Sequence, residues 1–330
     1  MRLLAAPDKF RGTLTAAAAA EAIAAGARAA GWTAAELPLA DGGEGTLDAL
    51  GGANRSTLVT GPLGTPVEAP WRLADGVAVI EAARASGLAL AGGKEGNDPV
   101  RATTRGTGEL VAAALAAGAE RVVVGVGGSA TTDGGLGAVE VLREHAPFAV
   151  PVRVCCDVQT RFVDAAAVYG PQKGATPRQV RELTARLREL AARYRAELGV
   201  DVEALPGAGA AGGLAGGLAA LGAELAPGFE LVAEAVGLDA ALGRADLVVS
   251  GEGFLDATSF AGKVVGGVLR RAGRRAVPVL VVAGHGEASA LARVRSVSLV
   301  ARFGRERAWA DAARCVADAV REELSSARAG

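Results

Sequence analysis

Short apolar runs alternate with helical patterns at both ends of this chain. The runs expected as strands cover residues 3–6, 34–39, 245–250, 277–283 and 294–300. The segments with helical spacing cover residues 15–30, 263–272 and 309–324. The first of these helices has Thr15 in a position to cap it. The alternation predicts βα units and a parallel sheet.

The middle of the chain begins with a different pattern. Between residues 55 and 80, short extended runs are broken by Gly61-Pro62, Gly64 and Asp75-Gly76, which is typical of a β-meander. Further strands are expected at 121–126 and 152–156, and further helices at 108–117, 135–143 and 177–198. We therefore predict an α/β fold with two domains. Residues 1–52 plus 229–330 form a doubly wound, flavodoxin- or Rossmann-like parallel-sheet domain, and residues 53–228 form a second α/β domain inserted into it.

Composition and charge narrow the class of protein. The net charge of −1 over 330 residues shows no basic excess, so we expect neither a nucleic acid nor a membrane as partner. Three cysteines, two of them adjacent, form neither a disulfide framework nor a zinc motif. The first residues lack the apolar region of a signal peptide, and the uncharged stretch 204–223 is mostly glycine and alanine. We expect a cytoplasmic protein, for which a homodimer is compatible with the sequence.

The order of residue types in segment 122–135 is typical of a ligand-binding site. A run of β-branched residues ends in glycines, hydroxyl side chains follow, and Asp133 precedes a helical pattern. Glycines let the backbone come close to a ligand, and the amides at a helix start attract anions. The segment is therefore predicted to bind a phosphate or a carboxylate, with oxygen atoms that could also reach a metal.

Comparable loops follow other predicted strands. They combine glycines with acidic and basic residues, and they span residues 6–13, 40–46, 98–109, 206–213 and 250–263. Ligands of open α/β sheets bind beyond the carboxyl ends of the strands, so we expect these loops to form one composite cleft. His285, one of only two histidines, also follows a strand end and is a further candidate.

Two glycine patterns leave a dinucleotide site open as an alternative. Residues 125–130 fit G-x-G-x-x-A after a strand, but the acidic residue that NAD requires comes later than expected, at Asp157. Residues 207–212 fit G-x-G-x-x-G after a stretch that makes a poor strand. The sequence contains no Walker A motif, because Gly262-Lys263 lacks the upstream glycine and continues with Val264.

Taken in order, these motifs resemble those of the type I glycerate kinase family. The resembling blocks cover nearly the whole chain and span residues 6–15, 40–46, 60–64, 98–109, 127–135, 153–158, 169–175, 206–213 and 251–263. The resemblance implies two α/β domains with the active site in the cleft between them. It also implies phosphorylation of D-glycerate to 2-phosphoglycerate or 3-phosphoglycerate, with ATP and Mg²⁺.

The resemblance also implies roles for particular residues, in a reaction that depends mainly on positioning and charge stabilisation. Asp157, just past a strand, is the expected proton acceptor, and the other expected catalytic residues are Lys9 and Asp8. The expected substrate-binding residues are Arg11, Asp41, Thr103, Thr104, Arg105 and Lys173. The expected nucleotide-binding residues are Gly127, Gly128, Ser129, Thr131, Gly207, Gly209, Gly212 and Lys263. The expected metal ligands are Asp133, Glu252 and Asp256.

The chain departs from the family pattern at two loops. Residues 159–164 lack the usual Asn, Pro and Gly, and Phe254 replaces the usual arginine after Gly-Glu-Gly. Because Arg161 and Phe162 cannot easily adopt a glycine-like positive φ, we expect weaker glycerate affinity than in a typical member. Three alternatives stay open: a kinase for another small hydroxy acid, an NAD-dependent oxidoreductase, and a catalytically weak member that binds ligand.

Overall fold

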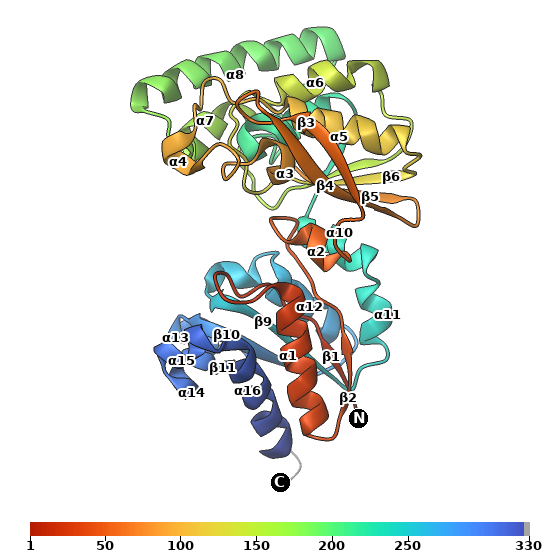
Figure 1. Ribbon diagram of the computed structural model, residues 1–330, viewed down its shortest axis with the longest axis vertical. Coiled ribbons are helices and arrows are strands. Elements are labelled where there is room, and N and C mark those ends of the chain that lie inside the picture. The colour runs from red at the N-terminus through yellow and green to blue at the C-terminus, as the bar shows by residue number, and fades with distance from the viewer. Residues whose placement is uncertain (327–330) are drawn as a thin grey trace. The chain divides into compact units, whose positions relative to one another are not determined.

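The computed structural model describes residues 1–326, and the chain in it divides into two compact units (Figure 1). Unit 1 consists of Met1–Asp41, Asp48–Leu50 and the chain from Phe229 on, and unit 2 consists of Gly42–Leu47 and Gly51–Gly228. Segments 42–47 and 51–52 thus belong to unit 2, whereas the sequence pattern predicted residues 1–52 as part of the first domain. For segment 42–47 the reason is the buried carboxylate of Glu81, which accepts hydrogen bonds from the amides of Gly45 and Leu47.

Unit 1 is built on a parallel five-stranded sheet in the order β11-β10-β9-β1-β2. The strands are β1 (Arg2–Ala5), β2 (Thr33–Glu36), β9 (Leu247–Leu255), β10 (Val279–Gly286) and β11 (Ser296–Ser298). The helices are α1 (Ala16–Ala29), α10 (Gly228–Ala235), α11 (Leu238–Leu242), α12 (Val264–Gly273), α13 (Ala288–Leu291), α14 (Leu299–Phe303), α15 (Arg305–Ala310) and α16 (Ala312–Ser326). Strands from both ends of the chain therefore share one sheet.

Helices cover both faces of this sheet, as in a doubly wound fold. Leu3 packs with α1 and α16 on one face, and its neighbour Leu4 packs with α10, α11 and α12 on the other. Successive residues of a strand face opposite sides, which explains the continuous apolar run. In Figure 1, α1 and α16 lie side by side, and Gly26 permits this because a Cβ there would lie 2.3 Å from the carbonyl oxygen of Ala317.

Unit 2 contains a six-stranded mixed sheet in the order β3-β4-β5-β6-β7-β8. The strands are β3 (Arg55–Thr60), β4 (Pro66–Ala74), β5 (Val77–Glu81), β6 (Arg121–Gly125), β7 (Val152–Cys155) and β8 (Glu224–Ala226). The antiparallel β3-β4-β5 part confirms the expected meander, and the pairs from β5 to β8 are parallel. The α-helices are α3 (Ala83–Ser86), α4 (Gly93–Gly96), α5 (Arg105–Ala116), α6 (Leu136–Leu142), α7 (Ala165–Tyr169), α8 (Pro177–Leu198) and α9 (Leu214–Ala220), and α2 (Thr46–Ala49) crosses the boundary between the units. The predicted α/β fold class is thereby confirmed.

Single side chains decide where the predicted elements begin and end. Helices α1 and α8 begin where expected, because Thr15 and Thr176 accept hydrogen bonds from amides in the first turn. The expected strand over 294–300 was wrong in its second half. The hydroxyl of Ser298 accepts a hydrogen bond from the amide of Ala301 and starts α14 there. The expected helix over 309–324 is divided into α15 and α16 near Asp311, which has an extended φ of −134°.

Candidate active site

Three carboxylates lie at the carboxyl ends of neighbouring strands in unit 1. Past β1, the amide of Asp8 donates to the carbonyl of Gly251 in β9, so that Asp8 lies beside Glu252. Past β2, the amide of Leu39 donates to the carbonyl of Pro7, which brings Asp41 to the same edge. The parallel sheet thus gathers acidic residues that are far apart in the sequence.

This environment makes Asp8 a proton acceptor that can work near neutral pH. Burial, followed by the charge of Asp41, raises the pKa of Asp8 to about 7. The amide of Lys9, which donates to Asp8 Oδ1 at 2.7 Å, and the charge of Lys9 offset part of this rise in pKa. Burial also raises the pKa of Glu252, against the opposing effects of Ser259 and Lys263. A carboxylate whose pKa lies near the working pH suits general-base catalysis.

Basic groups and a helix start accompany this cluster. Lys263 is the residue before the first turn of α12, and Gly262 reaches a φ of +98° with open space where a side chain would stand. The partial positive charge of a helix start favours anions, and a lysine there adds to it. Arg11 is exposed in the loop that follows β1. One carboxylate oxygen of Asp256 is already engaged, because Oδ1 accepts hydrogen bonds from Thr258 and Ser259.

In unit 2, a buried lysine holds the glycine-rich loop that follows β6. Lys173 Nζ donates to Ser129 Oγ at 2.9 Å and to the carbonyl of Thr131 at 2.6 Å. Asn97 Nδ2 donates to the carbonyls of Ala130 and Lys173. Burial lowers the pKa of Lys173 to about 7, with an opposing effect from Asp133. These bonds fix the shape of the loop whose amides were predicted to bind nucleotide.

Asp133 is half-buried, and hydrogen bonds within unit 2 engage its carboxylate. Its carboxylate accepts from the amide and hydroxyl of Thr104, both at 2.8 Å, and from the amides of Gly135 and Gly137. The Thr104 hydroxyl accepts a bond from Ala138, so its proton is free to go to Asp133. Burial raises the pKa of Asp133 and these bonds lower it. The carboxylate ties the start of α5 to the start of α6.

Close packing explains the glycines of the 207–213 loop. A Cβ on Gly209 would lie 2.3 Å from the carbonyl oxygen of Arg161, and a Cβ on Gly212 would lie 2.0 Å from that of Thr131. On Gly207 it would lie 2.5 Å from Cys156 Sγ. These three glycines are therefore required for the approach of other loops of unit 2, whether or not a phosphate binds nearby.

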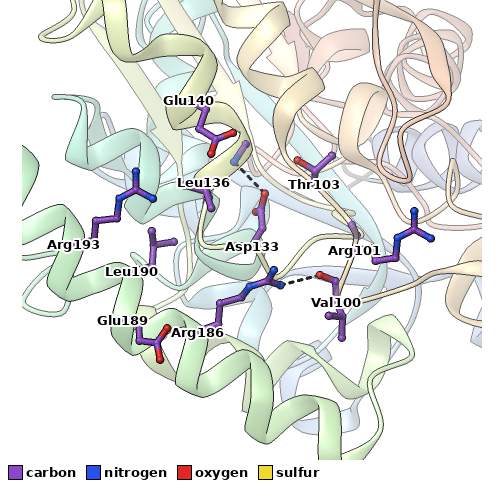
Figure 2. Close-up of a pocket in the computed structure, with 12 residues that line it drawn as sticks. Val100, Arg101, Thr103, Asp133, Leu136, Glu140, Arg186, Glu189, Leu190 and Arg193 are labelled. Atoms are coloured by element: carbon purple, nitrogen blue, oxygen red, sulfur yellow. Dashed lines mark hydrogen bonds between the residues drawn. The ribbon is translucent and has the colours of Figure 1, made fainter.

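Thr103 and Asp133 line a pocket of about 330 Å³ in unit 2, shown in Figure 2. One wall comes from α8, and the opposite wall comes from the loop before α5 and from the start of α6. Of the arginines in it, Arg186 donates to the carbonyl of Val100, and Arg193 is paired with Glu197. The pocket-lining residues are Val100, Arg101, Ala102, Thr103, Asp133, Leu136, Gly137, Glu140, Arg186, Glu189, Leu190 and Arg193. Because three arginines and three carboxylates line it, the pocket has no strong preference for an anion.

The remaining predicted residues occupy separate positions in unit 2. Arg105 forms an ion pair with Glu109 at 3.1 Å, and Glu109 also accepts hydrogen bonds from Thr60. Asp157 is exposed beyond β7, and its Oδ1 accepts from the amide of Gly228 at 2.9 Å. The structure thus places Asp8, Lys9, Arg11, Asp41, Glu252, Asp256 and Lys263 in unit 1, and the other predicted site residues in unit 2.

The unusual loop 159–164 has a structural explanation. Arg161 has a φ of −69°, and Phe162 begins a short 3₁₀ turn (Phe162–Asp164), so neither residue needs the positive φ that we expected to be a difficulty. The ring of Phe162 is completely buried and lies edge-to-face with Tyr194 at 6.1 Å. The basis for expecting weaker glycerate affinity was therefore wrong, since this bulky residue belongs to the hydrophobic core.

Asn97 and Glu81 position the loops of unit 2, and neither was predicted from the sequence. Asn97 lies before Asp98-Pro99 in a segment with no other sign of its role, and its Oδ1 is buried without a hydrogen-bond partner among the described residues. Glu81 could have been noticed, because a carboxylate at the end of an apolar strand must find donors when it is buried.

The carboxylate that best fits a magnesium ion is Glu252. Its Oε1 is buried and has no hydrogen-bond partner in the part of the chain that the structure describes. Within residues 1–326, no three His, Cys, Asp or Glu side chains converge tightly enough to form a complete metal cage. Magnesium sites in kinases commonly use one or two carboxylates together with waters and substrate phosphates. None of the described helices is long and apolar enough to span a bilayer.

The doubly wound unit, the second α/β unit and the carboxylate cluster at the strand ends define a two-domain α/β protein with the features of an enzyme. Residues 3–145 and 142–327 match the model of the glycerate kinase family, and the chain belongs to that family. It is 42% identical over 323 residues to a glycerate kinase of Halalkalibacterium halodurans, covering 86% of this chain and 85% of that protein. It is 40% identical over 325 residues to the glycerate 2-kinase of Escherichia coli K12, with coverage of 86% and 85%.

A solved structure gives the same result for the fold. The crystal structure of a proposed glycerate kinase 2 from Salmonella typhimurium LT2 superimposes with a TM-score of 0.86 at 35% sequence identity. The match covers 100% of this chain and 99% of that one, so both units of the fold are shared.

Proposed function

We propose that this protein phosphorylates D-glycerate with ATP and Mg²⁺ as a type I glycerate kinase, and that its product is 2-phosphoglycerate. Membership of the glycerate kinase family supports the phosphotransferase activity and the use of ATP. The similarity to the glycerate 2-kinase of Escherichia coli supports the choice of the 2-hydroxyl over the 3-hydroxyl. We place the protein in the cytoplasm, and a homodimer is the assembly to test first.

The observation that carries the mechanism is the half-buried carboxylate of Asp8, whose pKa burial and the charge of Asp41 raise to about 7. We assign to Asp8 the removal of the proton from the glycerate hydroxyl as the hydroxyl oxygen attacks the γ-phosphorus. Asp157 is the competing candidate, since it also follows a strand, but it is exposed and its Oδ1 is held by the amide of Gly228. A base buried among like charges gains more from accepting a proton than an exposed one does.

Other residues of unit 1 provide charge. We assign Lys9 and Lys263 to the phosphates and Arg11 to the glycerate carboxylate, because cationic side chains form the strongest hydrogen bonds with such oxyanions. Asp41 keeps its proposed role in substrate binding, and in addition its charge raises the pKa of Asp8.

Residues of unit 2 complete the proposed set. The substrate-binding residues proposed there are Thr103, Thr104, Arg105 and Lys173. The nucleotide-binding residues proposed there are Gly127, Gly128, Ser129, Thr131, Gly207, Gly209 and Gly212. For Lys173 and Thr104 we favour an indirect role, since both hold loops in place through buried hydrogen bonds.

Among the proposed metal ligands, Glu252 and Asp256 would hold the ion. A bound Mg²⁺ would neutralise charge on the phosphate oxygens during transfer. Asp133 is less suited, because its oxygens already accept four hydrogen bonds.

The test is a glycerate-dependent ADP-release assay on purified, folded protein. We expect ADP release with D-glycerate and Mg²⁺, its loss on addition of EDTA, and a ³¹P spectrum of 2-phosphoglycerate. Absence of glycerate-dependent ADP release would reject the kinase. Stabilisation by NAD but not by ATP–Mg²⁺ in a thermal-shift assay would favour an oxidoreductase instead.

A further inference from the structure

Strands β9 and β10 continue beyond the rest of their sheet. The last register pair between β1 and β9 is Ala5 with Val249, whereas β9 and β10 remain paired as far as Leu255 and Gly286. Within this two-stranded extension, Phe254 lies directly opposite His285. Paired positions of neighbouring strands point to the same face, so the two rings project together from the carboxyl end of the sheet.

Both rings of this pair are exposed. Phe254 is 50% exposed, and its ring lies edge-to-face with that of His285 at 5.9 Å between centroids. Among the exposed large hydrophobic residues of the described chain, the aromatic ones are Phe254 and Trp309, and Phe254 is the one that lies in a strand. An accessible aromatic face at this edge of an α/β sheet can stack against a planar ligand.

The backbone around the pair is closely packed. A Cβ on Gly253 would lie 2.9 Å from the amide nitrogen of Arg11, and a Cβ on Gly284 would lie 2.6 Å from the carbonyl oxygen of Gly253. The extension therefore packs against the loop that carries Asp8, Lys9 and Arg11. A platform that is already fixed loses little entropy when a ligand stacks on it.

The aromatic pair also shares its sheet face with Glu252, the proposed ligand of the metal ion that accompanies a triphosphate. Glu252 and Phe254 are two residues apart in β9, so their side chains project from the same face, roughly 7 Å apart along the strand. The charge of Lys263, at the start of α12, acts on Glu252. Lys263, Glu252 and the aromatic pair therefore lie at the same end of the sheet of unit 1.

We propose that Phe254 and His285 form a stacking platform for the base of the nucleotide, a subsite that selects a nucleoside triphosphate over a bare polyphosphate. The proposal rests on the proposed function in one respect, namely that the phosphoryl donor is ATP. Stacking tolerates any base, so the platform strengthens binding without reading the identity of the base.

The experiment compares ATP with inorganic tripolyphosphate, which has the phosphates but no base. Binding of each is measured by calorimetry without glycerate, for wild type and for Phe254→Ala, Phe254→Tyr and Leu58→Ala. Loss of one stacking ring weakens binding about tenfold, so the ATP affinity of Phe254→Ala should be about tenfold lower than that of wild type. It should leave the affinity for tripolyphosphate unchanged, and Phe254→Tyr should restore the affinity for ATP. Leu58 is an exposed strand residue of unit 2, and its variant should match wild type for both ligands.

Each other outcome has a separate meaning. If Phe254→Ala weakens ATP and tripolyphosphate equally, or changes neither, the stacking platform is rejected. If Phe254→Tyr fails to restore ATP affinity, a flat ring is not what the site requires, and the proposal is also wrong. Failure of the proposed function would show differently, as a wild-type protein that binds ATP but releases no ADP with D-glycerate.

Discussion

The loop after β1 and the loop after β6 each contain a half-buried aspartate, and the surroundings of the two carboxylates differ. Asp133 accepts four hydrogen bonds from backbone amides and a threonine hydroxyl. Asp8 accepts a bond from the neighbouring amide and faces the charges of Asp41 and Glu252. Burial raises the pKa in both cases, but at Asp8 like charges add to the effect, whereas at Asp133 hydrogen bonds oppose it.

The comparison distinguishes a carboxylate that stabilises the fold from a carboxylate that is suited to accept a proton in the reaction. A carboxylate that accepts several hydrogen bonds from the surrounding loops holds those loops together and has less capacity for a new ligand. A carboxylate that is buried among like charges destabilises the fold, and it is retained where a proton must be accepted near neutral pH. Four variants test this contrast.

The largest effect is expected from Asp8→Asn. The amide cannot accept the hydroxyl proton, so kcat should fall by about 100-fold or more. In wild type, kcat/KM should rise with pH through about 7, as Asp8 loses its proton. Turnover by the variant within tenfold of wild type would move the base to another residue.

Asp133→Asn should be the most destabilising of the four. An asparagine offers one acceptor oxygen and turns an NH₂ group toward backbone amides that are themselves donors. We expect the free energy of unfolding to fall by about 3 kcal/mol, measured by urea denaturation. A loss under about 1 kcal/mol would mean that the hydrogen bonds to Asp133 contribute little to the fold.

Lys173→Met should change how stability depends on pH. The folded protein holds Lys173 with a pKa of about 7, against 10.5 for the ordinary side chain, so between these values the unfolded chain binds more protons. Wild-type stability should therefore rise with pH across this window relative to the variant, by at most about 1.4 kcal/mol per pH unit. Parallel stability curves from pH 7 to 9 would show that Lys173 is not buried as described.

The smallest effect is expected from Asp157→Asn. Its exposed carboxylate holds the amide of Gly228 through Oδ1, and the asparagine oxygen can accept the same bond. We expect kcat to change by less than about threefold, with ATP affinity intact. A fall as large as that for Asp8→Asn would restore Asp157 as the base, as the sequence first indicated.

The sequence was sufficient to predict the fold class and to locate the loops. It was not sufficient to predict which side chains are buried or hydrogen-bonded. Periodicity located α8 to the residue, and glycine with aspartate after apolar runs marked the strand ends. Both kinds of aspartate look alike in a sequence, because their difference depends on amides that the fold brings from distant segments. Phe162 shows the same limit, since its burial comes from packing against Tyr194, and a local motif could not reveal it.

The most direct test is to measure stability and turnover on one preparation of Asp8→Asn, at pH 8 and without Mg²⁺ during unfolding. A raised acid pKa means that stability falls as pH rises from about 4 to about 7, so the full cost of the charge is present at pH 8. The variant removes that charge and should unfold with a free energy about 2 kcal/mol higher than wild type, because each pKa unit corresponds to about 1.4 kcal/mol and the buried amide retains part of the cost. A variant that is more stable than wild type and inactive would support the claim that the Asp8 carboxylate serves catalysis at a cost in stability. A variant that is less stable than wild type, or equally active, would contradict it.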